Sequence, residues 1–177
     1  DTVTNINYIP SLIKVENANN VTVQNLTFVN SPQAAVIYLN CDNIKIVNNN
    51  FIGGDTVASC VASINYYAVY GYNSDFGLLS GNRITDNASG KTFAEGFFLY
   101  GINYTKVTNN YFKNVVDHDV YMYHSVGDLL GINNYNTISD NVSYTNLTTV
   151  TQKIGSSIKV HGIFNLINGN NIVNTFA

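Results

Sequence analysis

One short pattern recurs along the chain: an apolar residue, two further residues, an asparagine, one further residue and usually a second apolar residue. Its central positions hold Leu26 in the first copy and then Asn49, Asn82, Asn110, Asn141 and Asn170. The steps between these positions are 23, 33, 28, 31 and 29 residues. Repeats of this length are typical of solenoids, whose stacked strands keep their register while the loops between them vary in length.

A second strand is predicted before each copy of the pattern. The six segments are Leu12–Glu16, Val36–Asn40, Ala68–Tyr72, Phe98–Ile102, Tyr121–Ser125 and Ser157–His161. Side chains alternate between the two faces of a strand. Alternation predicts that the second residue of each segment faces a core, which gives the column Ile13, Ile37, Val69, Leu99, Met122 and Ile158. The third residue then faces outward, which gives the column Lys14, Tyr38, Tyr70, Tyr100, Tyr123 and Lys159.

Asparagines at equivalent turns of stacked coils have a physical use. Neighbouring parallel strands lie about 4.8 Å apart, so an inward Asn can hydrogen-bond the Asn of the next coil and nearby backbone. Such bonds satisfy amides that would otherwise be buried without partners. We therefore predict an all-β fold over residues 1–177 as one domain: a right-handed parallel β-helix solenoid of about six coils. Its internal asparagine ladder comprises Asn49, Asn82, Asn110, Asn141 and Asn170.

An antiparallel sandwich is the alternative all-β architecture. It predicts Asn-Gly or Asp-Gly hairpin turns between its strands. The two sequences of this kind, Gly81-Asn82 and Asn168-Gly169, lie inside the repeat instead. A third strand of the solenoid is expected after each ladder asparagine, without assigned bounds.

The composition excludes several classes of protein. Asparagine accounts for 30 of the 177 residues, yet 45% of the chain is hydrophobic, which argues against disorder. Only 19 residues are charged and the formal net charge is −3, so no nucleic-acid partner is expected. No apolar run is long enough for a transmembrane helix.

Two features point to an extracellular or cell-surface location. Cys41 and Cys60 are predicted to form a disulfide bond, which would suit an oxidising compartment and stabilise the fold by about 3 kcal/mol. Six N-glycosylation sequons begin at Asn20, Asn25, Asn87, Asn103, Asn141 and Asn146. A chain rich in Asn and Thr also produces such triplets by chance, so both explanations stay open.

Several segments resemble the parallel β-helix repeats of the pectin-lyase-like superfamily and of NosD-like surface proteins. They are NNVTVQNLTFVN, CDNIKIVNNNFIGG, NYTKVTNNYFKN, YNTISDNVSYTN and FNLINGNNIVN. The resemblance runs from about Leu12 to Val173 and implies a β-helix fold. The superfamily contains lyases, glycoside hydrolases, epimerases, tailspikes, adhesins and non-catalytic modules, so the fold does not select an activity.

The outward tyrosines are the candidate ligand-binding surface. They are Tyr38, Tyr70, Tyr100 and Tyr123, widened by Tyr121. Tyrosine rings stack on sugars and their hydroxyl groups form hydrogen bonds, so this face suits a glycan or another surface protein. The alternative is a cross-strand ladder that only stabilises the sheet.

Asp117, His118 and Asp119, with Lys159 one coil later, are weak catalytic candidates. Acidic and basic groups beside a sugar can support proton abstraction or hydrolysis. The triplet resembles the Asp-Pro-His-Asp motif of mannuronan C5-epimerases, but it lacks the proline and the accompanying Tyr and Arg. The alternative is a polar turn at the corner of a coil. No metal or cofactor site is predicted.

These observations favour a non-catalytic module that presents its tyrosine face to a glycan or a protein, with end-to-end or lateral self-association as a further mode of contact. The alternative is a polysaccharide lyase, epimerase or glycosidase acting on an acidic or neutral glycan. The sequence leaves open whether the chain is part of a larger surface protein.

Overall fold

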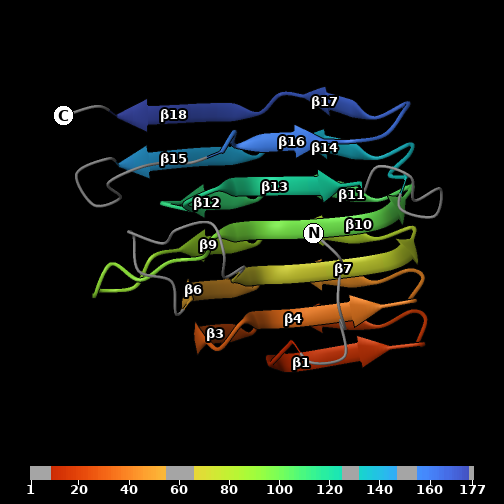
Figure 1. Cartoon of the computed structure of the whole chain (residues 1–177), viewed down its shortest axis with the longest axis horizontal. Helices are drawn as coiled ribbons and strands as arrows, with labels where there is room; N and C mark the ends of the chain where they lie inside the picture. The colour runs from red at the N-terminus through yellow and green to blue at the C-terminus, as the bar shows by residue number, and fades with distance from the viewer. Residues whose placement is uncertain (1–8, 55–65, 125–131, 147–154, 176–177) are drawn as a thin grey trace.

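The computed structural model describes residues 9–54, 66–124, 132–146 and 155–175. The regular structure in these residues is β-strand throughout, and all strand pairs are parallel. The strands form three six-stranded sheets, and each coil contributes one strand to each sheet. Figure 1 shows the coils stacked in chain order, from β1 at one end to β18 at the other. The predicted parallel solenoid of about six coils is therefore confirmed.

The three sheets line the three sides of each coil. Sheet A consists of β1 (Ser11–Glu16), β4 (Ala34–Leu39), β7 (Tyr67–Asp75), β10 (Glu95–Asn103), β13 (His118–Tyr123) and β16 (Ile158–Val160). Sheet B consists of β2 (Thr22–Gln24), β5 (Lys45–Val47), β8 (Leu78–Ser80), β11 (Lys106–Thr108), β14 (Thr137–Ser139) and β17 (Leu166–Asn168). Sheet C contains the third strand of each coil, which was expected after each ladder position. It consists of β3 (Thr27–Ser31), β6 (Asn50–Gly54), β9 (Arg83–Thr85), β12 (Tyr111–Lys113), β15 (Val142–Asn146) and β18 (Asn171–Thr175).

The core is made of like residues stacked along the solenoid axis. Each three-residue strand of sheet B directs its central residue inward, which gives the column Val23, Ile46, Leu79, Val107, Ile138 and Ile167. The middle members of this column are fully buried. Burial of one such side chain stabilises a fold by roughly 1.5–3 kcal/mol, so repetition in each coil supplies a continuous core.

The asparagine ladder lies at the turn between sheets B and C. The side-chain amide of each ladder Asn donates to the side-chain oxygen of the next, at 3.2 Å for Asn49 to Asn82 and 2.9 Å for Asn110 to Asn141. The same amide also donates to a carbonyl group of the preceding coil, as from Asn82 to Ile46 at 2.8 Å. The predicted ladder is thus observed, and Leu26 joins it only through its backbone N–H, 3.1 Å from Asn49 Oδ1.

The residue before each ladder Asn has a left-handed backbone conformation. These residues are Asn48, Gly81, Asn109, Asp140 and Gly169, with φ between 55° and 66°. Gly, Asn and Asp adopt this conformation at low cost, whereas most other residues do not. The turn that points the ladder inward therefore explains part of the Asn and Gly content of the repeat.

The predicted register of sheet A is wrong in one coil and displaced in two others. Ala35 and Val36 both face the core, so Tyr38 points inward and Ile37 points outward, the reverse of the prediction. Val36, and not Ile37, pairs with Ile13 and Val69, and a shift of one residue in alignment moves every side chain to the opposite face. Further along, Tyr100 pairs with Tyr72, two residues away from the predicted partner Tyr70, so Tyr70 and Tyr100 belong to different outward columns.

Other sequence expectations have mixed outcomes. Cys60 lies outside the described residues, so the disulfide bond stays a prediction. Cys41 is buried, and its Sγ lies 3.0 Å from the carbonyl oxygen of Leu39.

Among the predicted glycosylation sites, Asn141 is a buried ladder residue, which is incompatible with a glycan at that position. Asn20 and Asn25 are exposed. The described residues include no helix with the length and apolarity needed to cross a bilayer.

Candidate functional site

The outer face of sheet A carries two neighbouring columns of aromatic residues. The first runs from Ile37 through Tyr70, Phe98 and Tyr121 to Lys159. The second runs through Leu39, Tyr72, Tyr100 and Tyr123. Rings in adjacent coils stack, with centroids 5.3 Å apart for Tyr70 and Phe98 and 5.2 Å apart for Tyr72 and Tyr100.

The two ends of this face differ in exposure. Toward the N-terminal coils, Ile37 and Tyr70 are buried in an outer apolar cluster against which Ile9 packs. Tyr100 is also only 4% exposed. Toward the C-terminal coils, the side chains are half-buried: Phe98, Tyr121, Tyr123, Lys159 and His161. Of the tyrosines predicted to bind a ligand, Tyr121 and Tyr123 are therefore the two whose rings a partner can reach, while Tyr38 lies in the core.

Tyr121 is the centre of the half-buried part of the face. Its ring centroid lies 4.5 Å from that of His118 and 5.4 Å from that of Tyr123. Lys159 Nζ lies 4.5 Å from the centroid of the same ring, a cation–π contact. Burial raises the pKa of Tyr121, and a hydrogen bond with Lys159 opposes that rise. The Lys159 ammonium group and the Tyr121 ring and hydroxyl group thus lie together on one surface.

Beside Tyr121 lies a compact group of ionisable residues, Glu95, Asp117 and His118. His118 Nδ1 lies 3.2 Å from Glu95 Oε2 and 3.1 Å from Asp117 Oδ1. Glu95 and His118 occupy paired positions of β10 and β13, so coil stacking places them together. The sequence predicted Asp117 and His118 but missed Glu95, because nothing in the linear sequence links it to the triplet 22 residues later.

The surrounding residues shift the pKa values of Glu95 and His118. Burial raises the pKa of Glu95 to about 7, although its hydrogen bond with His118 acts in the opposite direction. Burial alone would lower the pKa of His118, but hydrogen bonds to Asp117 and Glu95 outweigh burial and raise it to about 9. His118 is therefore a cation at neutral pH, held between two carboxyl groups. The ligand atoms of the three residues lie within 4.8 Å of one another, close enough to hold a metal ion.

Asp119 does not belong to this group. It faces the solenoid interior, where Ser143 Oγ donates to its Oδ2 at 2.5 Å. The Ser157 hydroxyl lies 3.1 Å from that of Ser143. His118 and Asp119 lie on opposite faces because successive side chains of a strand alternate. Of the four catalytic candidates, Asp117, His118 and Lys159 share a face and Asp119 does not.

A third aromatic column was missed by the sequence analysis. It follows the corner between sheets A and B and consists of Phe76, Tyr104, Tyr135 and Phe164. Each lies six residues before a ladder asparagine, a spacing that the repeat itself could have revealed. All four are exposed, between 49% and 69%.

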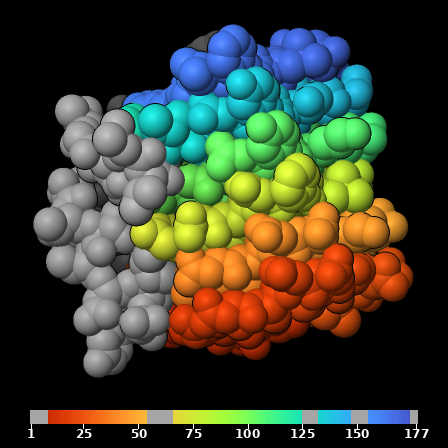
Figure 2. All heavy atoms as spheres, turned by 90° about the vertical axis from the view of Figure 1, so that its right-hand side faces the viewer, coloured from red at the N-terminus to blue at the C-terminus, as the bar shows by residue number. Residues whose placement is uncertain are grey.

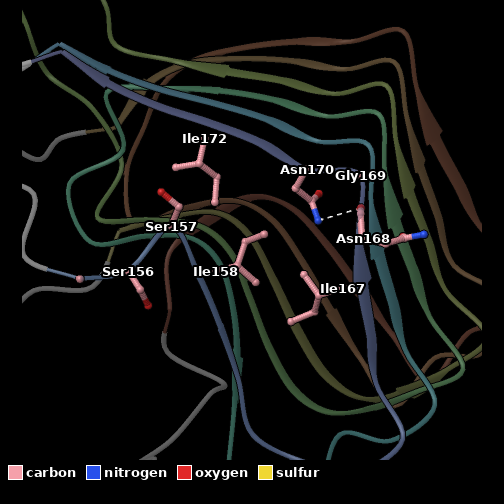
Figure 3. Close-up of a pocket in the computed structure, with 9 residues that line it drawn as sticks. Ser156, Ser157, Ile158, Ile167, Asn168, Gly169, Asn170 and Ile172 are labelled. Carbon is pink, nitrogen blue, oxygen red and sulfur yellow. Dashed lines mark hydrogen bonds between the residues drawn. The ribbon is translucent and has the colours of Figure 1, made fainter.

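A hollow of about 510 Å³ opens at the C-terminal end of the described solenoid. Figure 3 shows Ile158, Ile167 and Ile172 pointing into it, with Asn170 donating to Asn168 beside them. These isoleucines continue the inward columns of the preceding coil, so the hollow is the interior of the last coil. Its described lining has no acidic or basic side chain, and it therefore differs in chemistry from the face around Tyr121.

Comparison with known proteins identifies the architecture. A family model described as a right-handed beta helix region matches residues 11–177. No curated protein and no solved structure gave a significant match to the chain. The match covers all three sheets, including the outer face of sheet A.

Proposed function

Because the chain belongs to the family of proteins with a right-handed β-helix region, we propose that it is a rigid extracellular module that binds an acidic glycan through sheet A. The family establishes the fold alone, so the proposal depends on the chemistry of one surface. That surface is the half-buried group of Phe98, Tyr121, Tyr123, Lys159 and His161, here named the Tyr121 face.

One observation carries the proposal: Lys159 Nζ lies over the half-buried Tyr121 ring, with Tyr123 and His161 beside it. Tyrosine rings offer apolar area and a hydroxyl group to a sugar at low entropic cost. The Lys159 ammonium supplies a counter-charge for a sugar carboxylate, whereas the His118 side chain is paired with the carboxyl groups of Glu95 and Asp117. This combination favours a uronate-containing glycan over a neutral one.

The rigidity of the fold supports such a role. The rings belong to strands whose register is set by parallel pairing with both neighbouring coils. Their geometry is therefore established before any ligand binds, and little conformational entropy is lost on binding. Exposed sequons at Asn20 and Asn25 are consistent with an extracellular location.

The test is an array of acidic and neutral oligosaccharides probed with the full chain. We expect retention on uronate oligosaccharides that is lost in Tyr121→Ala and weakened in Lys159→Met. Sheet C offers a matched control, because Arg83 Cζ lies 4.8 Å from the centroid of the Tyr111 ring. Tyr111→Ala and Arg83→Met should bind like the unmodified chain. The proposal would be contradicted if the sheet A variants and the sheet C variants lost retention equally, or if the unmodified chain were not retained on acidic glycans.

A second candidate is a polysaccharide-modifying enzyme, favoured by the Glu95–His118–Asp117 group. A carboxyl group with a pKa of about 7 suits proton transfer at neutral pH. In an elimination, a base would remove the C5 proton of a uronate while an acid protonates the departing glycosidic oxygen, leaving a C4–C5 double bond. However, Glu95 is 4% and His118 6% exposed, which restricts contact with a substrate.

Turnover separates the two candidates. Any retained glycan is incubated with the chain, and unsaturated and reducing ends are then measured. The binding module leaves the glycan intact, whereas an enzyme releases new ends in a reaction that Glu95→Gln and His118→Asn abolish without abolishing retention.

A further inference from the structure

The aromatic column at the corner between sheets A and B consists of exposed, stacked rings that the packing of the core does not explain. We name Phe76, Tyr104, Tyr135 and Phe164 the aromatic ridge. Adjacent centroids are 5.1 Å apart, and successive ring planes lie within 12°, 3° and 11° of parallel. Figure 2 faces this corner and shows the side chains of consecutive coils stacked as bands.

The backbone at the ridge is in an unusual conformation for aromatic residues. All four residues have left-handed φ values, between 53° and 58°. In the first two coils, Asn20 and Asn43 hold the same position with φ of 61° and 56°. Asn adopts this conformation readily, and a bulky residue there is an outlier. The turn itself is therefore formed as well by Asn, and the four rings need another explanation.

The ring faces are not available to a sugar along most of the ridge. Each inner ring has another ring stacked on both sides, so its edge is directed away from the column. Aromatic edges pack well against other aromatic rings in edge-to-face or offset contacts. The ridge therefore fits an aromatic partner surface better than it fits a saccharide, which separates it from the Tyr121 face.

The two sides of the ridge carry opposite charge. One residue before the ridge position lie Asp42 and Asp75, and two residues after it lie Lys45 and Lys106. In the last coil the same two positions hold Ile163 and Leu166, which are 57% and 53% exposed. Both positions are thus charged in the coil of Asp42 and Lys45, and both are apolar in the last coil.

We infer that the aromatic ridge is the contact surface between two copies of this chain, which lie side by side with their solenoid axes parallel. A two-fold axis parallel to the solenoid places each coil opposite the same coil of the second copy. Asp42 then faces Lys45 of the second copy, and Ile163 faces Leu166 of the second copy. Each interface of this kind is formed by the same patch on both subunits.

The antiparallel arrangement is disfavoured by the same residues. With the six coils aligned in reverse order, it places the coil of Asp42 and Lys45 opposite the coil of Asn134 and Thr137, so that neither charge meets an opposite charge. The parallel arrangement pairs Asp42 with Lys45, Ile163 with Leu166 and ring with ring, whereas Asp75 meets Leu78 and Lys106 meets Asn103. The ion pair of Asp42 with Lys45, the apolar pair of Ile163 with Leu166 and the matched rings together favour a second copy in the parallel direction.

The first test measures the mass of the full chain by sedimentation over a range of concentrations. We expect a dimer that dissociates on dilution. The double variant Tyr104→Asn/Tyr135→Asn should dissociate at least ten-fold more readily while keeping its circular dichroism spectrum. It adopts the residue that the first two coils already use at this position. A wild-type monomer at all concentrations, or a dimer that the double variant leaves unchanged, would overturn the inference.

The second test addresses the direction of the two copies. Asp42→Lys and Lys45→Asp should each weaken the dimer, and the combined exchange Asp42→Lys/Lys45→Asp should restore it. Restoration requires that the two positions face each other across the interface. Additive weakening in the combined variant would instead contradict the parallel arrangement.

Discussion

Tyr38 packs directly over Gly71, and a Cβ atom at Gly71 would lie 2.3 Å from Cζ and from the hydroxyl oxygen of Tyr38. The two residues occupy paired positions on β4 and β7. The hydroxyl group of Tyr38 is buried without a hydrogen-bond partner among the described residues. This arrangement places a tyrosine inside the core and leaves glycine as the residue that makes room for it.

We predict opposite effects from two substitutions in this pair. Gly71→Ala should destabilise the fold by roughly 1–3 kcal/mol, because it overpacks the core. Tyr38→Phe should be neutral or stabilising by about 1 kcal/mol, because it removes a buried hydroxyl group that forms no hydrogen bond. Urea denaturation measures both. Tyr38→Leu should partly rescue Gly71→Ala, and independent, additive effects would show that the two side chains do not meet.

Removal of one member of the asparagine ladder should be costly. Asn110→Ala leaves the backbone N–H and the side-chain amide of Asn82 without their shared acceptor. Each buried group left unsatisfied costs about 1–3 kcal/mol, so we expect a loss of at least about 2 kcal/mol in the free energy of unfolding. The neighbouring change Asn109→Gly is the control, because Gly81 and Gly169 already occupy that left-handed position. If the two variants are equally stable, the ladder bonds contribute little.

Stability should decrease as the pH rises from about 6.5 to 9. Folding raises the pKa of His118 to about 9, so the folded state holds a proton that the unfolded state has already released. Each unit of this shift corresponds to about 1.4 kcal/mol. Glu95 acts with the same sign between its ordinary pKa and about 7.

Thermal unfolding at several pH values, in the presence of a chelator, tests this dependence. His118→Gln should flatten the decline between pH 6.5 and 9. His161→Gln should not, because the pKa of His161 is lowered and its contribution has the opposite sign. A decline that persists in His118→Gln would assign the effect to another group.

Tyr104→Asn should change the stability of the monomer by less than about 1 kcal/mol. The substitution removes two stacked ring contacts, each worth about 0.5–1.5 kcal/mol. It also relieves a left-handed conformation that costs a bulky residue about 1–2 kcal/mol. Tyr104→Ala loses the same ring contacts, but alanine adopts the left-handed conformation less readily than asparagine does. It should therefore be less stable than Tyr104→Asn. The reverse order, measured by urea denaturation, would contradict this explanation of the ridge.

The sequence predicts the parts of the fold that repeat and misses those that depend on the exact register of one strand against the next. Asn49 to Asn170 could be aligned because each ladder position lies in the same short turn, directly after a residue with left-handed backbone. Tyr38 was predicted on the wrong face, because Val36 and not Ile37 aligns with Ile13, and these two apolar residues suit a core equally well. Glu95 joins His118 only through the stacking of β10 on β13, across loops of unequal length. The aromatic ridge was detectable, since its residues keep a fixed distance from the ladder.

Calorimetric titration with a galacturonate oligosaccharide is the most direct test of the proposed function. The full chain and its Arg83→Met variant should bind with the same Kd. Lys159→Met should bind at least about ten-fold more weakly, a loss of about 1.4 kcal/mol, and high salt should remove most of the difference. Equal affinity of Lys159→Met and the unmodified chain, or no binding heat from either, would contradict a glycan site on the Tyr121 face.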